Sequence, residues 1–180
     1  MIIIDNLYNK SNKPTSVALG YFDGVHVGHK KVLCNAVKDA GNNLIPTVFT
    51  FNSIPVNKKK DNNPVEIMSF EDKALIFKEM GIKRLYSIKF EDIMNLNADS
   101  FVKDVLVLSL NARKVYCGFN YRFSKGRSAD AYILKDLCSK YDVDVEIIPP
   151  CLDGECIVSS TLIRNYIKLG DMDKAGKLLG

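Results

Sequence analysis

Two histidines, three residues apart, lie in a glycine-rich stretch near the start of this 180-residue chain. The stretch reads Gly-Tyr-Phe-Asp-Gly-Val-His-Val-Gly-His over residues 20–29, and His26 and His29 are the only histidines in the sequence. Imidazole can donate a hydrogen bond to a phosphate oxygen, and its protonated form adds positive charge. Such a pair can therefore stabilise negative charge that develops on a phosphorus centre. Two solvated histidines in an ordinary turn, or a transition-metal pair that lacks a third ligand, are the alternatives.

The local sequence places the two histidines at the start of a helix. Residues 16–19 form an apolar run typical of a buried strand, and apolar side chains recur at helical spacing over residues 30–40. Side chains three residues apart in the first helical turn project to the same side. The unpaired amides of that turn and the positive end of the helix dipole favour a bound phosphate. We therefore predict a strand, turn and helix that together bind a phosphate group.

Strands and helices alternate along the rest of the chain. The patterns predict strands over residues 44–51, 83–90, 114–118 and 143–148, helices capped by Ser69 and Asn97, and a helix over residues 131–141. This alternation is typical of an α/β fold, here a Rossmann-like, doubly wound parallel sheet with right-handed crossovers. Ligands of such sheets bind beyond the carboxyl ends of the strands, where the strand order reverses.

Composition and charge argue against several classes of protein. The chain is 47% hydrophobic and 26% charged, with a net charge of +4, which is ordinary for one soluble domain. No apolar run approaches the roughly 18 residues of a membrane span, and residues 1–5 carry no basic segment of a secretory signal. Five cysteines without a C-x-x-C pair indicate neither a disulfide framework nor a zinc site. We expect a cytoplasmic protein with no membrane or nucleic-acid partner.

Two further segments have residue types that suit a phosphorylated ligand. Residues 158–164 read Val-Ser-Ser-Thr-Leu-Ile-Arg, with hydroxyl side chains at a helix start, and Thr161 and Arg164 can face one ligand. On its own this segment equally fits a helix cap with a surface arginine. Residues 118–128 combine aromatic and basic side chains in a loop after a strand. Such a loop can also stack a nucleic-acid base, which is the alternative interpretation.

All three segments resemble motifs of one enzyme family. Residues 20–29 resemble the G-x-F-D-G-x-H-x-G-H stretch of nucleotidyltransferases, and the Phe-Asp-Gly-Val portion is similar to the adenylyltransferase module of bacterial riboflavin kinase/FAD synthetases. Residues 158–164 resemble the I-S-S-T-x-I-R motif of that module, with Val158 in the isoleucine position. Residues 118–128 resemble its G-x-[DN]-[FY]-x-F-G-x-x-R-x-G region, with Ser124 where a glycine is usual. The resemblance extends over nearly the whole chain.

The resemblance implies a fold, a reaction and a set of site residues. It implies the nucleotidyltransferase fold, with residues 1–180 as one FAD synthetase-type adenylyltransferase domain and no flavokinase domain. The reaction would transfer AMP from ATP to FMN and give FAD and pyrophosphate, with Mg²⁺ held through phosphates and not by protein ligands alone. The implied catalytic residues are His26, His29 and Arg164. The implied nucleotide-binding residues are Gly20, Phe22, Asp23, Gly24, Gly28, Ser159, Ser160 and Thr161, and the implied flavin-binding residues are Asn120, Phe123 and Arg127.

One departure from the family pattern keeps other functions open. The family commonly has Pro-His-Pro after Thr-Phe, whereas Thr50-Phe51 is followed here by Asn52-Ser53-Ile54-Pro55. Flavin affinity or the identity of the acceptor can differ as a result. The alternatives are an adenylyl- or cytidylyltransferase that acts on another phosphorylated acceptor, and a non-catalytic regulator that binds flavin or nucleotide. Asp23 can orient the turn or contact nucleotide or metal, and the sequence does not specify an oligomeric state.

Overall fold

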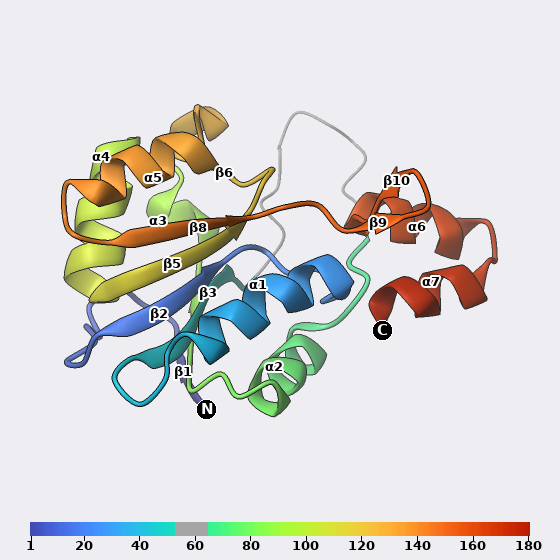
Figure 1. Ribbon diagram of the computed structural model, residues 1–180, viewed down its shortest axis with the longest axis horizontal. Helices are drawn as coiled ribbons and strands as arrows, with labels where there is room; N and C mark the ends of the chain where they lie inside the picture. The colour runs from blue at the N-terminus through green and yellow to red at the C-terminus, as the bar shows by residue number, and fades with distance from the viewer. Residues whose placement is uncertain (53–64) are drawn as a thin grey trace.

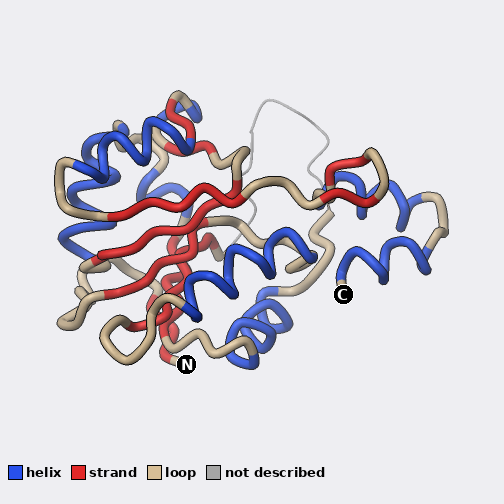
Figure 2. The backbone as a smooth tube through the Cα atoms, in the orientation of Figure 1, coloured by secondary structure: helices blue, strands red, loops and turns tan. Residues whose placement is uncertain are grey.

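A six-stranded parallel sheet forms the centre of the molecule in the computed structural model, which describes residues 1–52 and 65–180 (Figures 1 and 2). The spatial order is β1 (Ile2–Ile4), β4 (Arg84–Ile88), β3 (Ile45–Phe51), β2 (Thr15–Leu19), β5 (Ala112–Gly118) and β8 (Asp144–Ile148). From β2 the chain proceeds outward through β3 and β4 on one side, and through β5 and β8 on the other. The strand order therefore reverses between β2 and β5, and the predicted doubly wound parallel sheet is confirmed.

Helices cover both faces of this sheet (Figure 1). One face packs against α1 (Val27–Lys38) and α2 (Phe70–Glu79). The other packs against the π-type helix η1 (Phe101–Ser109) and α5 (Ala131–Ser139), next to the short helices α3 (Phe90–Ile93) and α4 (Ala98–Ser100). Successive side chains of a strand point to opposite faces, so Val17 and Leu19 of β2 lie in the cluster around η1 and α5, whereas Ala18 lies in the cluster around α1.

A small C-terminal unit lies beyond the carboxyl ends of the strands (Figure 1). It consists of the hairpin β9 (Leu152–Asp153) and β10 (Cys156–Ile157) and the helices α6 (Ser160–Lys168) and α7 (Met172–Leu179). Ile163, Ala175 and Leu178 form its core, and Val27 of α1 packs against that core. This contact brings residues 158–164 next to the start of α1, although more than 120 residues separate the two segments in the sequence.

The predicted elements agree with the observed ones to within a few residues. Ser69 accepts a hydrogen bond from the Asp72 amide at 3.1 Å and begins α2, and Asn97 caps the helix that leads into η1. Sequence patterns missed β1 and the short β9–β10 pair, because strands of two or three residues have no periodicity. The predicted loop over residues 118–128 contains two short elements that the sequence did not indicate: β6 (Arg122–Phe123) and the 3-10 turn η2 (Lys125–Arg127). β6 pairs with β7 (Ala129–Asp130).

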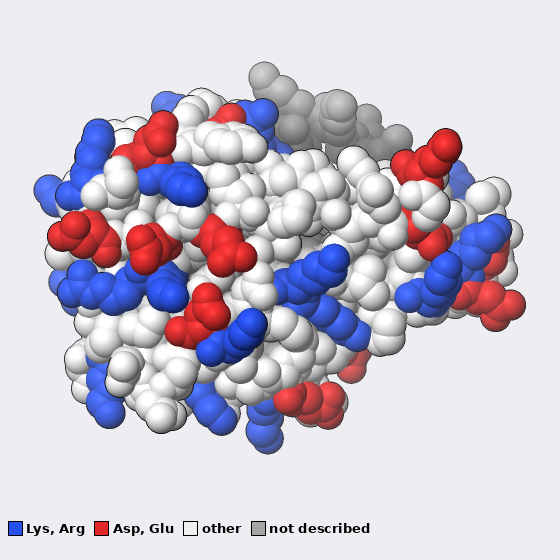
Figure 3. Space-filling view, viewed as in Figure 1, with Lys and Arg blue, Asp and Glu red and all other residues white. Residues whose placement is uncertain are grey.

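The surface of the molecule shows acidic and basic side chains interspersed over the face seen in Figure 3. No helix in the described ranges is long and apolar enough to cross a membrane. The cytoplasmic location and the lack of a nucleic-acid partner stay predictions. The predicted loop at residues 52–65, including the departure at residues 53–55, falls almost entirely outside the described residues.

Candidate active site

The turn between β2 and α1 is buried and tightly folded. Gly24 has φ +77°, and a Cβ there would lie 3.1 Å from the side chains of Ile67 and Leu179. Phe22 and Val25 also adopt positive φ, of 57° and 36°, which side chains other than glycine rarely do. Both are almost completely buried, so packing holds the turn in this unfavourable backbone conformation.

The two histidines stack on each other at the start of α1. Their ring centroids are 3.6 Å apart with an interplanar angle of 17°, which confirms that both rings project to one side. His26 is the N-cap residue, and its Nδ1 accepts a hydrogen bond from the His29 amide at 3.3 Å. Gly28 makes room for this arrangement, because a Cβ there would lie 3.2 Å from the His26 ring. The Phe22 ring contacts His29 edge-on, with 5.3 Å between centroids.

Burial disfavours the protonated form of both imidazoles in this site. Burial lowers the pKa of His26 from its ordinary 6.5 to about 4, against the opposing charge of Asp23. Burial also lowers the pKa of His29 well below its usual value, and the neighbouring charges of His26 and Lys73 lower it further. The buried Nδ1 of His29 has no hydrogen-bond partner in the described part of the chain. An anion bound beside these rings would favour their protonated forms and raise both pKa values.

The side chain of Asp23 joins the turn to two distant segments. One carboxylate oxygen accepts a hydrogen bond from the Ile67 amide at 3.0 Å, and the other pairs with the guanidinium of Arg164. Arg164 also donates from Nε to the Val65 carbonyl at 2.9 Å. The structure therefore places Asp23 as a buried anchor of the turn and brings Arg164 to the same turn as the histidines.

The hydroxyl side chains at the start of α6 differ in what they contact. Ser159 caps the helix by accepting from the Leu162 amide at 3.2 Å, and Ser160 donates to the Asp23 carbonyl at 2.9 Å. Both hydroxyls thus hold α6 in place against the turn. Thr161 is exposed, and its hydroxyl has no partner among the residues that the structure describes.

A comparison with protein-family models identifies the family to which a chain with this turn and this α6 belongs. A model described as FAD synthetase matches residues 8–162. This chain belongs to the FAD synthetase family. It is 32% identical to an FAD synthetase from Listeria monocytogenes, over 96% of this chain and 71% of that protein. It is 31% identical to a bifunctional riboflavin kinase/FMN adenylyltransferase from Buchnera aphidicola, over 100% of this chain and 60% of that protein.

Solved structures of known proteins agree with the fold. A crystal structure described as a macrolide-efflux protein from Streptococcus pneumoniae superposes with a TM-score of 0.88 at 32% identity, over 99% of this chain and 61% of that one. Pantothenate synthetase from Thermus thermophilus superposes with a TM-score of 0.59 at 16% identity, over 97% of this chain and 71% of that one, and shows a shared fold only. The chain spans about 60% of the length of several relatives that it matches.

In this member of the FAD synthetase family, residues 119–130 after β5, here called the ribbon, contain the short strands β6 and β7 and present only some of the predicted flavin-binding side chains at the surface. Asn120 and Arg127 are exposed beyond the end of β5. Phe123 is buried instead, with its ring centroid 5.2 Å from that of Phe101 and 6.0 Å from that of Tyr121. Ser124 has φ 71° and ψ 168°, a region that essentially only glycine adopts. That conformation explains why the family pattern has glycine at the position of Ser124.

Three side chains that the sequence analysis did not select lie next to the turn. The hydroxyl of Tyr21 donates to Glu66, and the ammonium of Lys73 lies 4.4 Å from the centroid of the Tyr21 ring. Lys73 is only 2% exposed. A signal was present in the sequence, because Lys73 lies four residues before the buried Phe77 and so occupies an inward position of α2.

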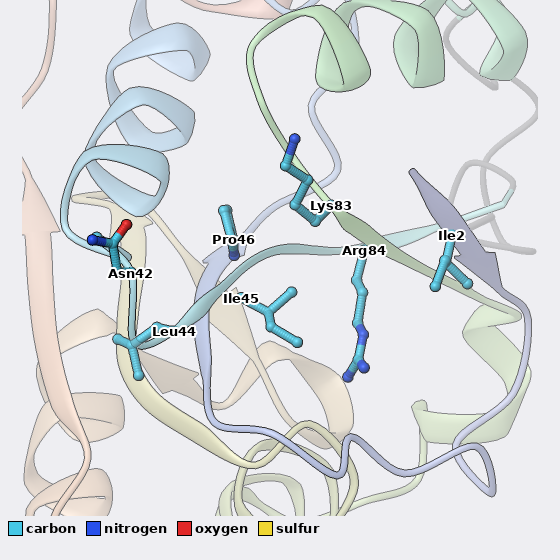
Figure 4. Close-up of a pocket in the computed structure, with 8 residues that line it drawn as sticks. Ile2, Asn42, Leu44, Ile45, Pro46, Lys83 and Arg84 are labelled. Carbon is cyan, nitrogen blue, oxygen red and sulfur yellow. The ribbon is translucent and has the colours of Figure 1, made fainter.

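A shallow hollow at the opposite edge of the sheet has no part in this site. It is lined by Ile2, Leu44 and Ile45 with Lys83 and Arg84, at the amino ends of β1, β3 and β4 (Figure 4). No histidine or carboxylate appears in the described lining. The candidate site is at the carboxyl edge, where the Ser160 hydroxyl and the Arg164 guanidinium of α6 contact Asp23 of the turn.

Proposed function

We propose that this chain is an FMN adenylyltransferase, which transfers AMP from ATP to FMN and releases pyrophosphate. The observation that carries the proposal is the stacked pair of His26 and His29 at the start of α1, with Arg164 held beside the same turn. The site lies next to the point where the strand order reverses, where ligands of such sheets bind. Membership of the FAD synthetase family, whose members are nucleotidyltransferases, supports this class of reaction.

The reaction requires the protein mainly to align the two substrates and to offset the repulsion between their negative charges. A phosphate oxygen of FMN attacks the α-phosphorus of ATP, the new P–O bond joins FMN to AMP, and the bond to pyrophosphate breaks. The attacking group is already an anion, so no protein nucleophile is needed, and the obstacles are orientation and charge repulsion. The backbone N–H groups of Val27 and Gly28 have no hydrogen-bond acceptor among the described residues and can hold a phosphate oxygen.

The proposed roles follow from which donors the fold leaves available. His26 and His29 donate to the α-phosphate, most strongly in the transition state. Thr161 and the remaining donors of Arg164 bind the other phosphates, while Ser159 and Ser160 position α6. The backbone of Gly20, Phe22, Asp23, Gly24 and Gly28 shapes the nucleotide site. Asn120 and Arg127 bind the flavin, and Phe123 supports that ribbon from the core.

Magnesium fits this site as an ion bound by substrate. The described residues contain no cluster of three or more histidine, cysteine, aspartate or glutamate side chains that could hold a metal. The carboxylate of Asp23 is engaged by Arg164 and the Ile67 amide. Mg²⁺ would therefore be held chiefly by phosphate oxygens, where it neutralises part of the triphosphate charge.

A second candidate keeps this chemistry and changes the acceptor. Phe123 is packed in the core and does not present its ring at the surface of the ribbon. A phosphorylated acceptor without a flavin ring would not need that contact. This alternative predicts AMP transfer to another phosphomonoester, with the same dependence on the histidines.

A pyrophosphate-release assay with ATP and Mg²⁺ tests both candidates. FMN, riboflavin and nicotinamide mononucleotide serve as acceptors, and products are identified by mass. We expect FAD from FMN alone; product from another acceptor would favour the second candidate, and no turnover despite nucleotide binding would favour a regulator. The riboflavin sample also tests whether the chain lacks flavokinase activity.

The variant His29→Ala tests the role of the histidine pair. Turnover should fall at least about a hundredfold, in the range found for lost transition-state hydrogen bonds, while nucleotide binding changes far less. Lys31→Ala changes an exposed residue of the same helix and is the matched control. Unchanged turnover in His29→Ala would contradict the proposed role.

A further inference from the structure

Lys73 is a buried lysine beneath the glycine-rich turn. It lies on the inward face of α2 and is 2% exposed, whereas Lys78, on the same helix, is exposed. Its ammonium contacts the face of the Tyr21 ring, and Tyr21 is part of the turn itself. Burial lowers the pKa of Lys73, and the charges of Glu66 and Asp23 oppose that change. The amino group of a lysine is therefore held inside the protein next to the turn.

Both nearby carboxylates are occupied by other groups. Glu66 accepts the hydroxyl proton of Tyr21, and Asp23 is engaged by Arg164 and by the Ile67 amide. Lys73 itself forms no hydrogen bond and no ion pair with a residue in the described ranges. Burial of an ammonium without a hydrogen-bonded partner costs free energy, and contact with an aromatic ring offsets only part of it.

A second unsatisfied group belongs to the same turn. The Phe22 ring lies edge-on both to His29, with 5.3 Å between centroids, and to Phe77 of α2, with 5.7 Å, and the buried Nδ1 of His29 lacks a partner in the described structure. Lys73 and His29, which can both bind an anion, thus flank one turn, and that turn has unpaired amides at the start of α1. A single kind of ligand, an oxyanion that accepts several hydrogen bonds, would satisfy all of them.

We propose that Lys73 is a further phosphate-binding residue of this site, whose buried ammonium pairs with a phosphate oxygen of the bound nucleotide or of the pyrophosphate product. The proposal rests on the proposed function only in taking the turn as the phosphate site. A purely structural lysine would stabilise the empty protein. A ligand-binding lysine instead makes the empty protein less stable than an apolar residue would, and it gains its partner when the phosphate binds.

The test compares Lys73→Met, Lys73→Arg and the exposed control Lys78→Met. Binding of inorganic pyrophosphate and of ATP is measured by calorimetry, and thermal unfolding is measured with and without pyrophosphate. We expect Lys73→Met to bind pyrophosphate about tenfold or more weakly, with an unfolding midpoint equal to or above that of the wild type when no ligand is present. Lys73→Arg, which keeps the charge, should retain more binding, and Lys78→Met should match the wild type.

Several results would overturn the assignment. Wild-type affinity in Lys73→Met, or a lowered unfolding midpoint or failure to fold in that variant without ligand, would make Lys73 a structural residue. If the wild type binds ATP and pyrophosphate but does not adenylylate FMN, the proposed function fails. The role of Lys73 is then decided by the pyrophosphate affinity and the unfolding midpoint of its variants. If the wild type binds neither ligand, both proposals fail.

Discussion

The pairing of Asp23 with Arg164 makes a measurable prediction about stability. The side chain of Asp23 is 2% exposed and that of Arg164 is 25% exposed, so the burial of this ion pair is intermediate between that of a fully buried pair and that of a surface pair. Loss of one partner of a fully buried pair costs about 3–5 kcal/mol, and an exposed pair contributes at most about 1 kcal/mol. For Asp23→Ala, which also leaves the Ile67 amide without its acceptor, we expect a loss of about 2–3 kcal/mol.

A double-mutant cycle isolates the interaction between the two side chains. Arg164→Met keeps much of the apolar packing but leaves the Asp23 charge buried, so a loss of about 2 kcal/mol is expected. The double variant should then lose about 1–2 kcal/mol less than the sum of the two single variants. In a domain of this size each kcal/mol lowers the unfolding midpoint by about 2–4 °C, so thermal and urea unfolding both resolve the effect.

The exposed pair between Lys177 and Asp153 is the matched control. Its N–O distance is 2.7 Å, but the lysine side chain is 70% exposed, so Lys177→Met should leave the unfolding midpoint unchanged. Additive losses in the Asp23 and Arg164 variants would show that the two side chains do not stabilise each other. The account of Asp23 as the anchor of the turn would then be wrong.

Three further predictions concern the turn and the ribbon. Gly28→Ala should leave the free energy of unfolding nearly unchanged, because alanine favours the helix. Its Cβ would displace the His26 ring and reduce turnover about tenfold or more in the pyrophosphate-release assay. Normal turnover would show that the position of this ring is unimportant. Ser124→Gly should raise the free energy of unfolding by about 1 kcal/mol by relieving an unfavourable conformation, as urea titration would show, and a loss would contradict this account. Because the pKa of His26 is lower in the folded protein than in the unfolded chain, the unfolded chain binds a proton at this side chain first as the pH falls. Stability that is present above pH 6.5 should therefore decline as the pH falls toward about 4. His26→Gln should flatten this part of the curve of unfolding midpoint against pH, and an unchanged curve would refute the lowered pKa of His26.

Local patterns in the sequence were sufficient for the histidine turn and for every strand of the sheet except the edge strand β1. Short apolar runs, separated by segments of helical periodicity, predicted the strands β2, β3, β4, β5 and β8. A strand that is buried on both faces needs such a continuous apolar run. The Gly-x-His spacing placed both imidazoles at one helix start, because residues three apart share a side in the first turn. These features depend on neighbours in the sequence, so they were predictable without a tertiary structure.

The partners of the polar side chains depended on contacts between distant segments. The sequence assigned Ser159 and Ser160 to phosphate, but α6 packs against the turn and uses both hydroxyls to hold itself there. It assigned Phe123 to the flavin, but the ring fills space next to Phe101 in the core. Hydroxyls and aromatic rings suit either purpose, and the contacts that they make within the protein depend on the packing of distant segments.

The sequence by itself determined the α/β class, the position of the glycine-rich histidine turn and the family resemblance, since each rests on local periodicity or on a contiguous motif. Only the tertiary structure decided that Asp23 is engaged by Arg164 and that Lys73 is buried without a hydrogen-bonded partner in the described ranges. Charge pairing and burial depend on which segments meet in space. Helical spacing can place Lys73 on the inward side of α2, but only the folded chain shows which groups surround its amino group.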